Sequence, residues 1–177
     1  MAQKSWPWDW QPGGPKPPYE ALGEVTAAFA ALKLRTNEVV WHLANPKNLE
    51  ASATVTAGCS ARQVIELGLA LLKTARISAL VARSGTALLT EARDLNKRRN
   101  EATHSMWFLG DVDGTKVWMR SSVNDHKTLD ENRISDGVTE VSHTDLISLR
   151  NEMLDLVTRL VGFSETMYSD APAEPRS

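Results

Sequence analysis

The last third of the chain carries a long apolar stripe at helical spacing. Its large apolar residues recur at steps of three and four, which brings them to one face of an α-helix. They are Leu146, Leu149, Met153, Leu156, Leu160, Phe163 and Met167. A second stripe beside it contains Ile147, Leu154, Val157 and Val161. An apolar face this broad is stable only when other apolar surface covers it. It therefore predicts a helical bundle, and it could serve a dimer contact as well.

Three earlier segments show the same helical period. The helices expected along the chain cover residues 19–43, 61–85, 86–105 and 142–168. Asn45-Pro46 should end the first, because proline disfavours helical backbone in the residue before it. Ser60 is a suitable N-cap for the second, and Gly85 is expected to stop that helix. The polar residues 47–58 are predicted to form a loop.

The period changes between the third and the last helix. The segment WFLGDVDGTKVWMR contains two short apolar runs on either side of Asp113-Gly114, a dipeptide typical of a tight hairpin turn. With these two residues in the turn, Leu109 faces Trp118 and Trp107 faces Arg120. This register should return Arg120 towards the end of the third helix. Residues 122–141 are polar and are predicted to form a loop.

The last helix begins with Ser142, and Asp145 stands three residues later, as in a capping box. The sequence thus predicts an all-α fold, a four-helix bundle over residues 19–168 with a small β-hairpin between the third and fourth helices. Residues 1–18 are rich in Trp and Pro and are expected to form an extended arm. Its tryptophans, Trp6, Trp8 and Trp10, should lie on apolar surface of this chain or of a partner. Residues 169–177 have the composition of a disordered tail.

Composition limits the classes of function. The chain has 20 Lys plus Arg against 22 Asp plus Glu, a formal charge of -2, so a nucleic-acid contact would have to be local. The single cysteine, Cys59, fits a reducing compartment. The N-terminus lacks the order of a signal peptide, and the apolar runs are too short to cross a membrane. We expect a cytoplasmic protein that does not associate with membranes.

The predicted third helix contains an arginine where an apolar residue is expected. Arg99 shares a helical stripe with Leu88, Ala92, Leu95, Ala102 and Met106. A buried arginine is costly unless it is paired. Asn100 and His104 share another face, whereas Arg99 and His104 point about 140° apart on an ideal helix. Arg99 must therefore use its length to reach the same ligand, or a two-fold dimer must form a cleft that both faces border.

These three residue types suit phosphodiester chemistry. Histidine can move protons near neutral pH, and arginine offers a permanent charge and a planar fork that matches a phosphate. Asparagine can position the imidazole or the phosphate by hydrogen bonding. A ribonuclease that uses the 2′-hydroxyl of RNA as nucleophile needs little more, so neither a metal nor another cofactor is expected.

The stretch Arg99-Asn100-Glu101-Ala102-Thr103-His104 resembles the Arg-polar-x-x-x-His signature of the HEPN superfamily, small all-helical domains of toxins, phage-defence proteins and RNA-processing nucleases. The resemblance implies a homodimer that cleaves single-stranded RNA without metal and leaves a cyclic phosphate. It implies that Arg99 stabilises the phosphate, Asn100 positions it and His104 acts as acid or base. It also implies a toxin, defence or RNA-turnover role, with a protein antitoxin or regulator as a possible partner. HEPN toxins silenced by nucleotidylation carry a tyrosine where this chain has Met106, so control of that kind is not expected.

Four further residues are candidates for substrate binding: Lys97, Arg98, Ser105 and Arg120. A solvated basic helix end explains Lys97 and Arg98 equally well, but not Arg99. Metal binding is not expected at the other histidines, His42, His126 and His143, because none has a partner at ligand spacing. Two other functions stay open: a catalytically silent HEPN-like dimer that binds RNA or a protein, and a helical adaptor whose Trp arm docks a partner.

Overall fold

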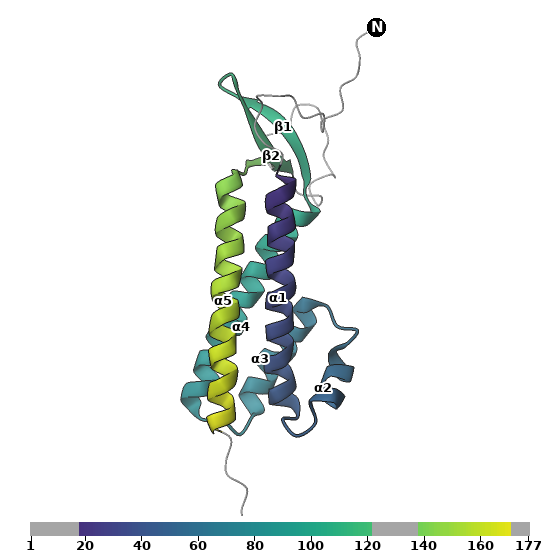
Figure 1. The fold of residues 1–177 in the computed structure, drawn as a ribbon, viewed down its shortest axis with the longest axis vertical. Helices are drawn as coiled ribbons and strands as arrows, with labels where there is room; N and C mark the ends of the chain where they lie inside the picture. The colour runs from purple at the N-terminus through teal and green to yellow at the C-terminus, as the bar shows by residue number, and fades with distance from the viewer. Residues whose placement is uncertain (1–17, 122–137, 171–177) are drawn as a thin grey trace, which may run out of the picture. The chain divides into compact units, whose positions relative to one another are not determined.

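The computed structural model describes residues 18–121 and 138–170, and most of these residues are helical (Figure 1). The described ranges contain α1 (Tyr19–Ala44), α2 (Leu49–Thr56), α3 (Ala61–Thr74), α4 (Ala79–His104), β1 (Met106–Val112), β2 (Thr115–Ser121), β3 (Val138–Glu140) and α5 (His143–Asp170). Residues 1–17 of the expected arm, including Trp6, Trp8 and Trp10, lie outside the described residues. The same holds for His126 and for residues 171–177, while α5 extends two residues into the expected tail.

The chain forms two compact units. The described residues of the first, called the hairpin unit below, are 18–26, 98–121 and 138–150. Those of the second, called the helical unit, are 27–97 and 151–170. The candidate residues Arg98, Arg99, Asn100, His104, Ser105 and Arg120 all belong to the hairpin unit.

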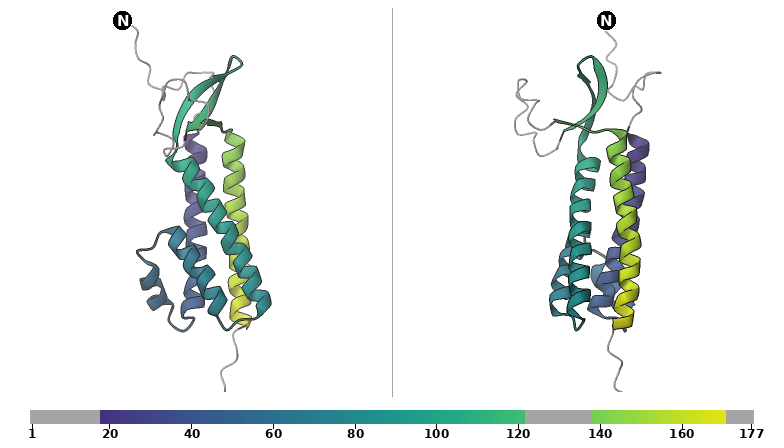
Figure 2. Two further views of the ribbon diagram at one scale, coloured as in Figure 1. Left: turned by 180° about the vertical axis from the view of Figure 1, so that it is seen from behind. Right: turned by 90° about the vertical axis from the view of Figure 1, so that its left-hand side faces the viewer.

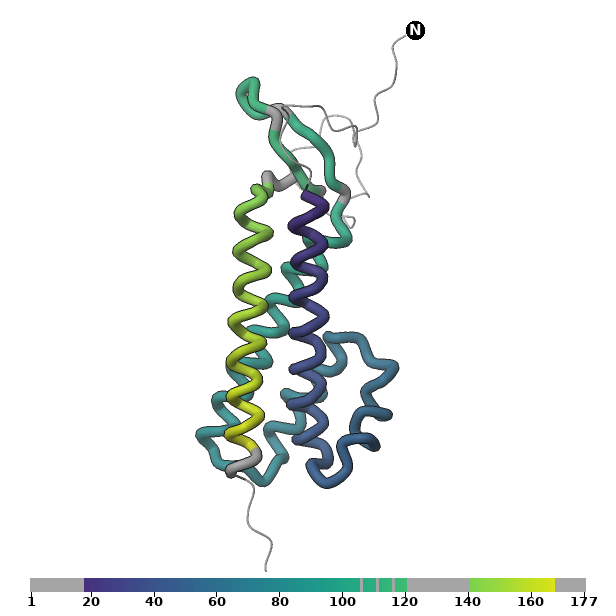
Figure 3. Tube along the Cα trace, viewed as in Figure 1, coloured from purple at the N-terminus to yellow at the C-terminus, as the bar shows by residue number. Residues whose placement is uncertain are grey.

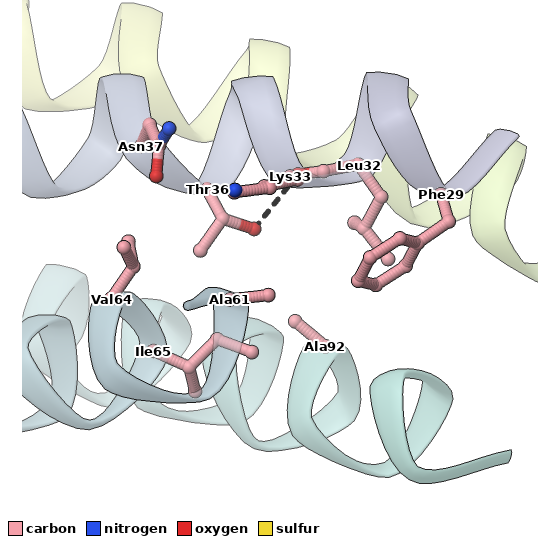
Figure 4. Close-up of a pocket in the computed structure, with 9 residues that line it drawn as sticks. All are labelled: Phe29, Leu32, Lys33, Thr36, Asn37, Ala61, Val64, Ile65 and Ala92. Carbon is pink, nitrogen blue, oxygen red and sulfur yellow. Dashed lines mark hydrogen bonds between the residues drawn. The ribbon is translucent and has the colours of Figure 1, made fainter. Parts of the chain in front are cut away.

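Parts of α1, α3, α4 and α5 enclose an apolar core in the helical unit (Figure 2). Its most deeply buried side chains are Leu32, Val39, Val40, Val64, Leu89, Met153, Leu156 and Leu160. Thr36 lies among them, and its hydroxyl donates to the carbonyl oxygen of Leu32 at 2.9 Å (Figure 4). That bond satisfies the hydroxyl without water, so a polar residue can occupy a core position of α1.

The expected helix end at Gly85 is wrong. The chain breaks earlier, between Thr74 and Ala79, and the hydroxyl of Ser78 accepts a hydrogen bond from the backbone N–H of Val81 at 3.3 Å. Gly85 lies inside α4, where a Cβ atom would come within 2.6 Å of Phe163 and 2.9 Å of Leu72. This glycine therefore allows three helices to pack closely and does not end one.

The expected loop at residues 47–58 is also wrong, because residues 49–56 form α2. The side chain of Asn48 caps this helix by accepting from the N–H of Ala51 at 3.0 Å. The buried positions of α2 are Ser52 and Thr56, and Thr56 also accepts a hydrogen bond from the indole N–H of Trp41 at 2.6 Å. Its buried face is polar, so hydrophobic spacing could not reveal this helix.

Both expected helix starts are confirmed. Ser60 caps α3 and forms a capping box with Gln63. Ser142 and Asp145 cap α5 reciprocally: the Ser142 N–H donates to the carboxylate at 2.8 Å, and the Asp145 N–H donates to the hydroxyl at 3.1 Å. Every residue of the first α5 stripe is buried, whereas Leu154 and Val161 of the second are 44% and 37% exposed.

The register predicted for the hairpin is confirmed. Leu109 pairs with Trp118 and Trp107 pairs with Arg120. Asp113 and Gly114 adopt φ angles of 51° and 79°, as a tight turn of this type requires. β3 pairs with β2 in the order β1-β2-β3, which corrects the expected loop at residues 138–140. Residues 122–137 of that loop lie outside the described residues.

Candidate functional site

The motif residues lie on the last two turns of α4, next to the hairpin. The helix ends at His104 and β1 begins at Met106, so Ser105 alone connects them. The chain trace runs from α4 directly into the hairpin (Figure 3). The indole N–H of Trp107 donates to the carbonyl oxygen of Ala102 at 2.8 Å. This bond satisfies one of the carbonyls that a helix end leaves without an internal partner. The hairpin therefore begins in a fixed relation to the motif.

Arg99 lies on the buried side of α4, as its place in the apolar stripe predicts. Ala92, Leu95 and Ala102 of that stripe are buried, and Arg99 is half-buried. Its Nη1 donates to Oδ1 of the exposed Asn100 at 2.9 Å. Burial removes water from the guanidinium and thereby lowers the pKa of Arg99 below its usual value. The length of the side chain thus brings the positive charge beside Asn100.

His104 is exposed, one turn after Asn100. Its imidazole makes no hydrogen bond or ion pair with any residue in the described ranges. An exposed, uncommitted imidazole can accept or donate a proton at a bound substrate. The structure therefore places a cation and an amide in contact, and an imidazole one helical turn further on.

Arg120 returns to the end of α4, as the hairpin register predicts. Its Nη2 lies 3.4 Å from Oε2 of Glu101. The side chain is 23% exposed, and its buried Nε has no hydrogen-bond partner among the described residues. The sequence analysis did not predict a role for Glu101. A glutamate within a basic stretch, to which the hairpin register returns Arg120, could have predicted this ion pair.

The remaining candidates differ in position. Lys97 and Arg98 are exposed on α4. The hydroxyl of Ser105 donates to the carbonyl oxygen of Glu101, so it is engaged with the helix backbone. The structure also contains an aromatic pair that the sequence did not predict. The rings of Tyr19 and Trp118 meet edge to face with centroids 6.4 Å apart, and Tyr19 is 51% exposed.

Other sites offer less chemistry. In the described ranges, no three His, Cys, Asp or Glu side chains are grouped as metal ligands, and no helix is long and apolar enough to cross a membrane. A groove in the helical unit is bordered by Arg35, Glu38, Trp41, His42 and Glu165. It mixes both signs of charge, and Arg35 is already paired with Glu38 at 2.7 Å.

Comparison with protein-family models, curated proteins and solved structures finds no match for this chain.

Proposed function

We propose that the protein is a metal-independent endoribonuclease of the HEPN type that cleaves single-stranded RNA. The observation that carries the proposal is the hydrogen bond between Arg99 and Asn100 on the helix that presents His104. It explains how an arginine and a histidine about 140° apart on a helix can serve one ligand. A basic helix end would need neither the half-buried guanidinium nor the asparagine beside it.

The reaction needs three tasks. In our proposal His104 takes the proton of the 2′-hydroxyl, whose oxygen then attacks the adjacent phosphorus. The bond from phosphorus to the 5′-oxygen breaks, and the products are a 2′,3′-cyclic phosphate and a 5′-hydroxyl. Arg99 stabilises the negative charge that builds up on the phosphoryl oxygens, and Asn100 fixes the direction of its planar fork.

The proposed active form is a homodimer with the two α4 ends at a shared groove. The leaving 5′-oxygen needs a proton, and the partner subunit's His104 supplies it in this arrangement. Two residues of the second α5 stripe support such an assembly, because Leu154 and Val161 are apolar and exposed. A cytoplasmic role as a toxin, a phage-defence nuclease or an RNA-turnover enzyme is part of the proposal, and a protein antitoxin or regulator would be a natural partner.

The test is cleavage of RNA by the purified protein in excess chelator, with identification of the end groups. The parent should leave cyclic phosphates, and His104→Ala should lose about 10²- to 10⁴-fold in rate, as expected for removal of a general acid or base. His143→Ala is the matched control, because His143 is also exposed and lies at a helix end. Intact RNA across varied sequences would refute the enzyme. Binding without cleavage would favour the silent HEPN-like dimer.

A further inference from the structure

We propose that Tyr19, Trp118 and Arg120 form a second substrate subsite, which holds an unpaired nucleotide of the RNA strand next to the cleavage site. The proposal rests on the proposed function, since it takes RNA as the ligand. It adds a substrate preference that the motif on α4 does not provide: at least one base beside the cleaved bond must be free to stack.

The hairpin register places the subsite residues on one face. Residues two apart on a strand point to the same side, and directly paired residues do so as well. Trp118 and Arg120 therefore share a face with their partners Leu109 and Trp107. On this face the indole N–H of Trp107 donates to the carbonyl oxygen of Ala102, and Arg120 forms an ion pair with Glu101. The face is therefore turned towards the end of α4. The subsite and the candidate catalytic residues therefore border one another.

The aromatic pair provides a stacking platform. Tyr19 begins α1, its ring plane lies at 61° to that of Trp118, and about half of its surface is exposed. Edge-to-face aromatic pairs are common in protein cores, but a ring that is half exposed can also stack on a nucleobase. Stacking needs the face of an unpaired base and tolerates any base, so we expect a preference for single strands with little sequence dependence.

Arg120 supplies the charge beside this platform. One of its terminal nitrogens is paired with Glu101, while its buried Nε has no hydrogen-bond partner among the described residues. The guanidinium has five N–H donors in a planar fork, and the ion pair with Glu101 involves one terminal nitrogen, so the group can also bind a phosphate oxygen. Glu101 lies one helical turn before His104, and residues three apart on a helix are neighbours on its surface. A phosphate on Arg120 would therefore be close to the phosphate that is cleaved.

The test separates binding from cleavage by using the full-length His104→Ala protein with a fluorescein-labelled 12-nucleotide RNA. The dissociation constant is measured for the single strand and for the same strand in a duplex. We expect Tyr19→Ala to weaken single-strand binding about 10-fold or more, the usual effect of removing one stacking partner. Tyr19→Phe keeps the ring and should bind like the parent. Arg120→Gln should weaken binding and reduce its dependence on salt.

The controls decide what a loss of binding means. Leu34→Ala changes an exposed apolar residue of the helical unit and should leave the dissociation constant unchanged. Circular dichroism melts of Tyr19→Ala show whether the variant is folded. Unchanged binding in both Tyr19→Ala and Arg120→Gln would overturn the subsite, as would equal affinity for duplex and single strand. If binding depends on Tyr19 but the parent does not cleave, the subsite stands and the nuclease function fails.

Discussion

The guanidinium of Arg99 donates to the side-chain oxygen of Asn100, its immediate neighbour on α4. Adjacent helical residues point about 100° apart, so this contact shows the arginine turning away from the apolar stripe on which its Cα lies. The bond holds the positive charge beside Asn100.

Loss of this bond should impair cleavage more than folding. We expect Asn100→Ala to lower the cleavage rate about 10²-fold, because a misplaced phosphate contact has an effect of this size. Arg99→Lys should also be impaired, since lysine keeps the charge but not the planar fork. Single-turnover kinetics and thermal melts of both variants test this. A normal rate in Arg99→Lys would show that charge alone is sufficient.

Two helical glycines should respond in opposite ways to the same substitution. Gly85→Ala should lower the free energy of unfolding by about 1–3 kcal/mol, because the new methyl group would overlap Phe163 and Leu72. Gly162→Ala should raise it by about 0.5–1 kcal/mol, since nothing lies within 4 Å and alanine favours the helix. Urea unfolding of both variants gives the two values. Equal effects would contradict the close packing at Gly85.

His42 should make stability depend on pH. Burial is the larger influence and lowers the pKa of His42, while the charge of Glu38 partly opposes it. The unfolded chain then binds more protons than the folded one just below the usual histidine pKa of about 6.5. Stability should therefore be highest above this pH and fall as the pH drops through it. His42→Gln should flatten the unfolding free energy between about pH 7 and pH 5, and an unchanged slope would exclude His42 as the cause.

The cap of α5 should also lose stability in acid, at a lower pH than the His42 effect. Hydrogen bonds from the Ser142 side chain and backbone lower the pKa of Asp145. This contribution is present above the usual aspartate pKa of about 3.9 and is lost as the pH falls through the lower folded value. Ser142→Ala should cost about 0.5–2 kcal/mol at pH 7. The cost should shrink towards pH 2, which chemical denaturation at both pH values can measure.

The hairpin and the α5 stripe could be predicted because local rules decided them. Asp113-Gly114 fixed the turn, the turn fixed the register, and the register brought Arg120 to the end of α4. The α5 stripe had no competing interpretation, because every member occupied its expected helical slot.

The predictions that were wrong concern residues that are compatible with more than one local structure. Gly85 could end a helix or let helices approach, and only the positions of Phe163 and Leu72 distinguish these. The buried face of α2 contains Ser52 and Thr56, so its composition resembled that of a loop. Tyr19 and Trp118 are about a hundred positions apart in the sequence, so their contact depends on the fold and has no local pattern.

Because Ser105 is the only residue between α4 and β1, the connection cannot change length when the hairpin moves relative to His104. Any tilt of β1 is passed through one peptide unit to the turn of helix that presents the imidazole. Insertions at this junction should therefore be far less tolerated than insertions at the Asp113-Gly114 tip.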